Sequence, residues 1–201
     1  MQIDIIFGII ILIISIMAHE VAHGVTAYAF GDPTAKNQGR LTLNPLKHID
    51  LFGSIILPLL LVWMSSPFLM GWAKPVPYNP YNLRNRRVGE FCVAIAGILT
   101  NFLIAIIFAL IIKFTLVLNL SQPVILLKKY IIYLNITLAV FNLIPIPPLD
   151  GSKILFTLVP YRYERQLMVL EKYGFYFLII LIVFFGGLIS TAVLALMKLM
   201  L

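Results

Sequence analysis

Hydrophobic positions divide the chain into long apolar stretches joined by short polar connectors. The hydrocarbon core of a bilayer requires about 20 mostly apolar residues for each spanning helix, and several stretches are that long. One runs from Ile5 through a short polar motif to Phe30, and four others hold no charged residue: Leu51–Ala73, Phe91–Ile112, Tyr130–Leu149 and Gly174–Met197. The pattern predicts an all-α polytopic membrane protein with five to six transmembrane helices.

The polar connectors predict smaller elements at the water interface. Within Gly31–Asp50, the stretch Gly39–Asn44 alternates polar and apolar residues, which favours a short membrane-associated β-hairpin after the first helix. Lys74–Val88 is rich in Pro, Asn and Arg and is typical of a loop. Tyr161–Tyr173 mixes charges and favours a short surface helix before the last span. No linker interrupts the pattern, so we expect one domain over residues 1–201.

Composition agrees with a membrane location. The chain is 61% hydrophobic and 11% charged, with a mean hydropathy of +1.01, whereas soluble domains are about 45–50% apolar. The net charge of +7 comes from Lys and Arg near the ends of the apolar stretches, so we expect contact with lipid headgroups and no nucleic-acid partner. The single cysteine excludes an internal disulfide. The first apolar run shows no cleavage site and is expected to be retained.

The first apolar stretch carries the motif His19-Glu20-Val21-Ala22-His23. Residues four apart share one face of a helix, so His19 and His23 can bind one zinc ion through their imidazoles. Glu20 lies beside them, where a carboxylate can take a proton from zinc-activated water and pass it to a leaving amine. By residue frequencies, the pattern arises by chance in about one chain in a thousand. The structural alternative is two buried histidines bonded to neighbouring helices, with Glu20 marking a polar pocket.

A catalytic zinc ion requires a third protein ligand. Asp150 is the best candidate because it directly follows an apolar stretch whose end is broken by three prolines. The alternative for Asp150 is an ordinary Asp-Gly turn. His48 and Asp50 compete as ligands, although a solvated turn or a helix cap explains them equally well.

Two amides within apolar spans, Asn101 and Asn142, are the candidate substrate-binding residues. A buried amide is costly unless it is hydrogen-bonded, and a bond to another helix is the simpler explanation for both. In the functional alternative, either side chain holds the backbone of a substrate.

Four motifs together resemble the site-2 protease family of intramembrane zinc metalloproteases, over nearly the whole chain. They are the stretch from His19 to Gly24, the stretch from Gly39 through Asp50, the stretch from Gly71 to Pro77, and the stretch from Asn142 to Gly151. The resemblance implies that His19, His23 and Asp150 bind one Zn²⁺ per chain, and that Glu20 is the general base and then the general acid. It also implies membrane-spanning protein substrates cut within or near the bilayer. Compact members without PDZ or CBS domains are the nearest in form, typically in a prokaryotic cell membrane.

Three hypotheses about activity follow. In the first, the protease binds an unwound substrate along a strand edge at Arg40–Asn44, because a helical substrate shields its own backbone. The second is a secondary transporter or ion channel, which also places acids, amides and broken helices at mid-membrane. The third is a catalytically inactive relative that binds membrane helices without cutting them. The sequence gives no oligomeric state.

Overall fold

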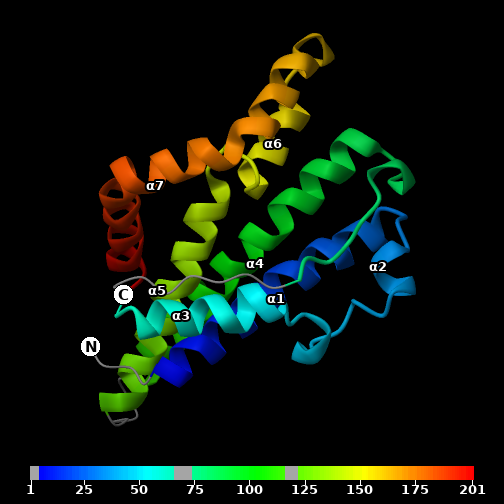
Figure 1. Cartoon of the computed structure of the whole chain (residues 1–201). Helices are drawn as coiled ribbons and strands as arrows, with labels where there is room; N and C mark the ends of the chain where they lie inside the picture. The colour runs from blue at the N-terminus through cyan, green and yellow to red at the C-terminus, as the bar shows by residue number, and fades with distance from the viewer. Residues whose placement is uncertain (1–4, 66–73, 116–121) are drawn as a thin grey trace.

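The computed structural model describes residues 5–65, 74–115 and 122–201. The elements in these ranges are all helical (Figure 1). They are α1 (Ile5–Ala29), α2 (Thr34–Asn37), η1 (Pro45–Lys47), the π-helical η2 (Leu51–Ile56), α3 (Leu57–Trp63), η3 (Pro80–Asn82), α4 (Arg86–Thr115), α5 (Gln122–Leu143), α6 (Asp150–Leu158), η5 (Tyr161–Tyr163) and α7 (Glu164–Met200). The expected all-α class is confirmed.

Four helices in the described ranges are long and apolar enough to cross a membrane. They correspond to α1, α4, α5 and α7, which makes the chain a membrane protein. The predicted span Leu51–Ala73 differs, because its helical part, Leu51–Trp63, is too short to cross a bilayer. Residues 66–73 of that prediction lie outside the described residues. Within the described ranges, the structure therefore supports four candidate spans, whereas the sequence predicted five to six.

The helix α4 is the centre of the bundle and packs against α1, α5 and α6. Its buried positions recur every three or four residues and are mostly small, so that neighbouring backbones can approach closely. These positions include Ala94, Gly97, Asn101, Ala105 and Ala109. A hydrophobic cluster beyond them joins α4 and α5 to the C-terminal part of α7. The helix that carries the His motif is thus fixed against α4.

The predicted β-hairpin after the first helix is wrong for the described chain, which contains no strand. The backbone groups of Gly39–Asn44 form hydrogen bonds with a nearby helix and a side chain, and not with a second strand. Arg40 N donates to Ala35 O at the end of α2 (2.9 Å), and the Thr42 carbonyl accepts from His48 Nε2 (2.8 Å). Local turns and a side chain therefore occupy groups that a ladder would need. The strand edge hypothesised at Arg40–Asn44 is absent with it.

The predicted surface helix over Tyr161–Tyr173 is not a separate element. After the short η5, α7 runs without interruption from Glu164 to Met200. In Figure 1 it bends where its colour passes from orange to red, and its sequence contains two adjacent glycines, Gly186 and Gly187. The hydroxyls of Ser190 and Thr191 donate to the carbonyls of these two glycines. Glycines and such hydroxyl contacts are known causes of helix bending.

The short helix α6 is held at both ends, and this fixes its first residue, Asp150. A Cβ on Gly151 would come within 2.5 Å of the carbonyl oxygens of Leu143 and Ile144, so only glycine allows α6 to begin directly against the end of α5. At the other end, Arg87 of α4 donates to the carbonyls of Thr157 and Val159. The segment Asp150-Gly151, for which an ordinary turn was the alternative, is thus the first turn of a helix.

The connector between Lys74 and Asn79 crosses α1 and is anchored at three points. Lys74 N donates to His48 O (2.8 Å), Val76 N to the Glu20 carboxylate (2.8 Å) and Asn79 N to the Asp32 carboxylate (2.7 Å). Val76 is buried against α1, where a Cβ on Gly24 would lie 2.6 Å from its side chain. The connector is therefore a fixed wall beside the His motif.

Asp32 is fully buried and accepts hydrogen bonds from Thr34, from Asn82 and from the backbone of Asn79. Burial alone would raise the pKa of Asp32, but these hydrogen bonds outweigh it and hold the pKa below its ordinary value. In Asp32→Asn, an amide donor in place of Oδ2 would face the Asn79 N–H. We expect a loss of about 2 kcal/mol, or about 4–8 °C in the melting temperature of the solubilised protein.

The pH dependence of this loss follows from the direction of the shift. A carboxyl group whose pKa is lowered by folding stabilises the protein above its ordinary pKa of about 3.9, and loses that effect as the pH falls through the lowered value. The difference between wild type and Asp32→Asn should be constant at neutral pH and shrink only in acid. The control Glu90→Gln removes an exposed ion pair with Arg86 and should change little. Equal melting temperatures for Asp32→Asn and wild type at pH 7 would contradict the assignment.

Candidate metal centre

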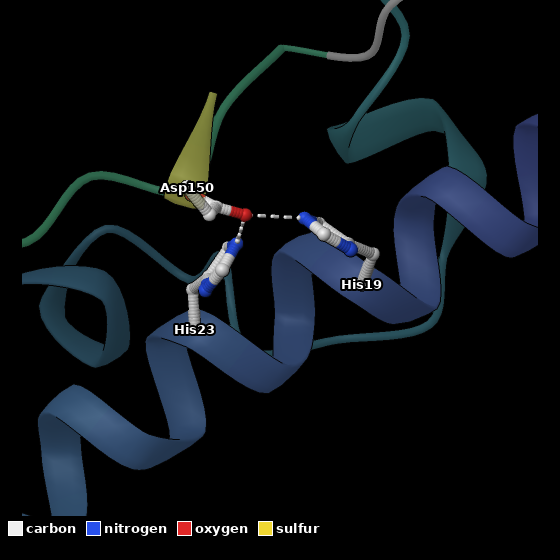
Figure 2. Close-up of side chains that lie close together, drawn as sticks. All are labelled: His19, His23 and Asp150. Atoms are coloured by element: carbon white, nitrogen blue, oxygen red, sulfur yellow. Dashed lines mark hydrogen bonds and ion pairs between the residues drawn. The ribbon is translucent and has the colours of Figure 1, made fainter. Parts of the chain in front are cut away.

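Three potential ligands converge between α1 and the start of α6 (Figure 2). Asp150 Oδ2 lies 2.9 Å from His19 Nε2 and 3.1 Å from His23 Nε2. All three side chains are buried, and their ligand atoms lie within 4.8 Å of one another. They form the one group of three or more His, Cys, Asp or Glu found in the described ranges that could hold a metal ion. The structure thus brings together residues that are 131 positions apart.

The hydrogen-bond partners of the two Nδ1 atoms show where each imidazole carries its proton. His23 Nδ1 lies 2.6 Å from the Val93 carbonyl, which can only accept, so this nitrogen carries the proton. His19 Nδ1 lies 2.6 Å from Asn101 Oδ1 and carries its proton for the same reason. In its neutral form, each imidazole therefore points an Nε2 lone pair at the Asp150 carboxylate. Three lone-pair atoms at this spacing repel one another unless a cation, a proton or a metal, lies among them.

The donor set fits zinc. Two neutral imidazole nitrogens and one carboxylate oxygen are a usual set for catalytic zinc, which keeps a fourth position open. Ligand atoms about 2.0–2.1 Å from a tetrahedral zinc ion are about 3.3 Å apart, and the two distances to Asp150 Oδ2 are 2.9 and 3.1 Å. A small outward shift of Asp150 would accommodate the ion.

Two charged side chains accompany the ligands. Glu20 follows His19 on α1, and its Oε2 accepts from Val76 N. Lys153, one turn beyond Asp150, donates to Asp150 Oδ1 (3.2 Å), the oxygen not shared with the histidines. Burial would lower the pKa of Lys153, but the Asp150 carboxylate raises it above its ordinary value. Burial would likewise raise the pKa of Asp150, and the positive charge of Lys153 acts in the opposite direction and lowers it. Lys153 therefore favours the ionised form of Asp150 and balances its charge.

The imidazole ring of His19 packs directly against Gly97 of α4, where no side chain is in its way. A Cβ at this position would lie 2.5–2.7 Å from three atoms of the His19 ring, so a methyl group would force the ring to move. We expect Gly97→Ala to weaken zinc binding by at least about tenfold, within the 10–100-fold range for disturbed ligand orientation. Chelator competition on the purified protein measures this.

The matched control is Gly186→Ala in α7, because a Cβ there meets nothing within 4 Å. It should bind zinc as wild type does and gain slightly in helix stability. Equal zinc affinity in Gly97→Ala and Gly186→Ala would show that the ring of His19 is not confined as the structure indicates.

The other residues singled out from sequence lie elsewhere. His48 is buried and donates to the Thr42 carbonyl, and Asp50 accepts from Gly53 N as a helix cap, so neither joins the ligand group. Asn142 donates to Leu138 O within its own helix. Asn101 is fully buried behind His19. A role for Asn101 or Asn142 in substrate binding stays a prediction.

Sequence reasoning missed two polar residues that reach the site. Asn135 is a fully buried amide that bonds to Asn101. It could have been found by the same signal as Asn101, an amide inside an apolar stretch. Lys153 could have been found by its spacing, because residues three apart on a helix are neighbours.

Comparison with known proteins identifies relatives of the same class. The model of peptidase family M50 matches residues 117–186, which include Asp150. YwhC of Bacillus subtilis, which is named as a candidate zinc metalloprotease, is 40% identical over 185 residues, covering 87% of this chain and 79% of the relative. Rip2 of Mycolicibacterium smegmatis, named likewise, is 28% identical over 88% of this chain and 68% of the relative. Rip2 of Mycobacterium tuberculosis H37Rv is 29% identical over 84% and 63%. No solved structure matches this chain.

These relatives favour the protease over the transporter and the inactive relative. The similarity to YwhC extends over most of both chains, and the three converged side chains are of the types that can hold a catalytic zinc ion. The chain therefore belongs to peptidase family M50, the site-2 protease family of intramembrane zinc metalloproteases.

Proposed function

We propose that His19, His23 and Asp150 hold one zinc ion, that Glu20 is the general base and then the general acid, and that the substrates are membrane-spanning proteins cut within or near the bilayer. One observation carries the proposal: a carboxylate oxygen lies 2.9 and 3.1 Å from two imidazole nitrogens, beside a glutamate. Two of the three proposed ligands, His19 and His23, lie on α1, which is long and apolar enough to span, so the chemistry would take place at membrane depth.

The residues divide the work of amide hydrolysis among them. Zinc, when bound, supplies Lewis acidity, which lowers the pKa of water towards about 7 and polarises a peptide carbonyl. Glu20 would take the proton released by the attacking water and return it to the leaving amine. The Val76 N–H holds one oxygen of Glu20 in place. The structure shows no protein hydrogen bond to the other oxygen in the part of the chain it describes, which leaves it available for proton transfer.

Lys153 would keep Asp150 in position during this cycle. Its ammonium holds Oδ1, so that Oδ2 alone faces the histidines. Its positive charge also offsets the negative charge of Asp150 in a buried place, where an uncompensated carboxylate is costly.

The surroundings of the protein are proposed from the helices and the relatives. We place the chain as a multi-pass protein in a prokaryotic cell membrane, because the described ranges hold four candidate spans and the relatives named above are bacterial. We treat residues 1–201 as one metalloprotease domain, because α4 contacts three helices that come from both halves of the chain.

The test is cleavage of a single-span model substrate by purified protein in lipid vesicles, with fragment masses giving the cleaved bond. We expect cuts inside or next to the span, and loss of cleavage when a chelator removes zinc. As a matched substrate, the same span with a helix-breaking Asn-Gly pair should be cut faster, because hydrolysis needs an extended backbone. Cleavage of soluble peptides alone would overturn the proposed substrate class, and cleavage that survives zinc removal would overturn the mechanism.

A further inference from the structure

Four buried polar side chains on α1, α4 and α5 are joined by hydrogen bonds. Of these four, the mechanism above uses only His19. The four are Ser15, His19, Asn101 and Asn135, and none of them is more than 6% exposed. His19 Nδ1 lies 2.6 Å from Asn101 Oδ1, Asn101 Nδ2 lies 2.9 Å from Asn135 Oδ1, and Asn135 Nδ2 lies 3.0 Å from Ser15 Oγ. Buried amides are costly to place in a membrane bundle, so a continuous line calls for an explanation.

Backbone carbonyls set the direction of the hydrogen bonds in this line: Ile131 O accepts from Asn135, and Ser15 O accepts from Asn101 Nδ2 at the longer distance of 3.5 Å. Asn135 Nδ2 also donates to Ile131 O (2.9 Å), one turn earlier on α5, and a carbonyl can only accept. The amino group of Asn135 must therefore face Ile131, and its oxygen must face Asn101. Asn101 must then turn its amino group to Asn135 and its oxygen to His19.

The proton on His19 follows from this order. An oxygen of Asn101 opposite Nδ1 requires Nδ1 to carry the proton, which leaves the lone pair on Nε2. Nε2 is the atom that lies 2.9 Å from Asp150 Oδ2 in the ligand group. With Asn101 turned round, its amino group would face Nδ1, and the proton would move to Nε2, where it blocks a metal. Partners behind a metal-binding histidine are known to fix its tautomer and orientation.

We propose that Asn135 and Asn101 are positioning residues that hold His19 in its zinc-binding tautomer, so that α5, which holds none of the proposed zinc ligands, controls zinc affinity. This rests on the proposed function, because it takes His19 as a zinc ligand. As a consequence, α4 and α5 must pack so that Asn101 and Asn135 are hydrogen-bonded if the site is to bind zinc tightly. Asn101 thereby acts through His19 rather than on a substrate.

The first test is the zinc dissociation constant of Asn135→Leu, measured by chelator competition in detergent. Leucine has a similar shape but leaves Asn101 Nδ2 with only its long contact to Ser15 O (3.5 Å) to orient it, so we expect zinc binding at least about tenfold weaker than in wild type. Ser15→Ala should change it by less than about threefold, because Ile131 O still orients Asn135. Thr137→Val is the matched control on α5, since it removes a hydroxyl bonded only to its own helix at Tyr133 O, and it should bind zinc as wild type does.

The second test is a rescue that a packing role would not give. In Asn101→Asp, both side-chain oxygens can only accept a hydrogen bond from His19 Nδ1. The direction of this hydrogen bond therefore no longer depends on Asn135. In the Asn101→Asp background, Asn135→Leu should therefore change zinc affinity by less than about threefold. The imidazole nitrogen chemical shifts of His19 should report the Nδ1-protonated form in wild type and in the double variant, and a mixture in Asn135→Leu. Asn135→Ala repeats the comparison if the leucine variant does not fold.

The outcomes separate this inference from the proposed function. Loss of zinc in His19→Ala with unchanged affinity in Asn135→Leu would overturn the inference alone, as would weakened binding without rescue. Unchanged zinc affinity in His19→Ala would overturn the ligand assignment on which both depend.

Discussion

Replacing Glu20 by Gln is expected to reduce cleavage by about 10²–10⁴-fold, the usual contribution of a general acid and base, while zinc stays bound. The physical reason is that an amide cannot take up a proton at neutral pH, although it has nearly the shape of the carboxylate. The amide oxygen can still accept from Val76 N, so the connector beside α1 should keep its place. Turnover of the vesicle-bound substrate and zinc content of the same preparation measure the two effects separately.

The control for Glu20→Gln is Glu90→Gln, which removes a carboxylate from α4 where it pairs with Arg86. It should cleave as wild type does. If Glu20→Gln retained more than about a tenth of the activity, the general-base role would be wrong. Loss of zinc in that variant would instead assign Glu20 a part in holding the metal.

Replacing Asp150 by Ala is expected to weaken zinc binding by more than about 100-fold, because changes behind a ligand already cost about 10–100-fold. The variant removes one of three proposed ligands and also leaves Lys153 without its carboxylate partner. The remaining positive charge would oppose a cation at the site. Cleavage should disappear with the zinc, and the dissociation constant from chelator competition is the direct measurement.

Asp50→Asn is the matched control for Asp150→Ala, because Asp50 was the rival ligand by sequence. In the structure Asp50 caps Gly53 N, and asparagine is an equally good cap, so zinc affinity and stability should both be kept. Strong zinc binding by Asp150→Ala, or its loss in Asp50→Asn, would reverse the choice between these two carboxylates.

The fixed wall beside the site limits how a substrate can approach. The connector from Lys74 to Asn79 is bonded at three points, to Glu20 on α1, to Asp32 after α1 and to His48 at the end of η1. In addition, Pro75 and Pro77 have no N–H to offer a substrate strand. Strand addition along Arg40–Asn44 is also absent, because that segment is not a strand. Substrate backbone must therefore find its partners elsewhere, or displace contacts that the structure shows.

The amino-acid sequence by itself determined the class of the protein and half of its metal site. Apolar runs report burial in lipid directly, so the helical membrane class and the spans α1, α4, α5 and α7 followed from counting residues. His19 and His23 were placed on one face because the helix repeat does so locally. The same local reasoning failed at Gly39–Asn44, where the alternation of polar and apolar residues suggested strands. In the structure, the backbone groups of this segment are hydrogen-bonded to His48 and to α2.

The tertiary structure alone decided which distant groups meet. Asp150 meets the histidines and Asp50 does not, because Gly151 and Arg87 hold α6 against α5 and α4, and no local pattern contains that packing. Distances that join separate helices showed that Asn101 is a hydrogen-bonding partner of His19 and that Asn135 and Lys153 also reach the site. The periodicity of a sequence shows which face of one helix is buried. A metal site is built from atoms of several segments, and their relative positions are set only when the helices pack.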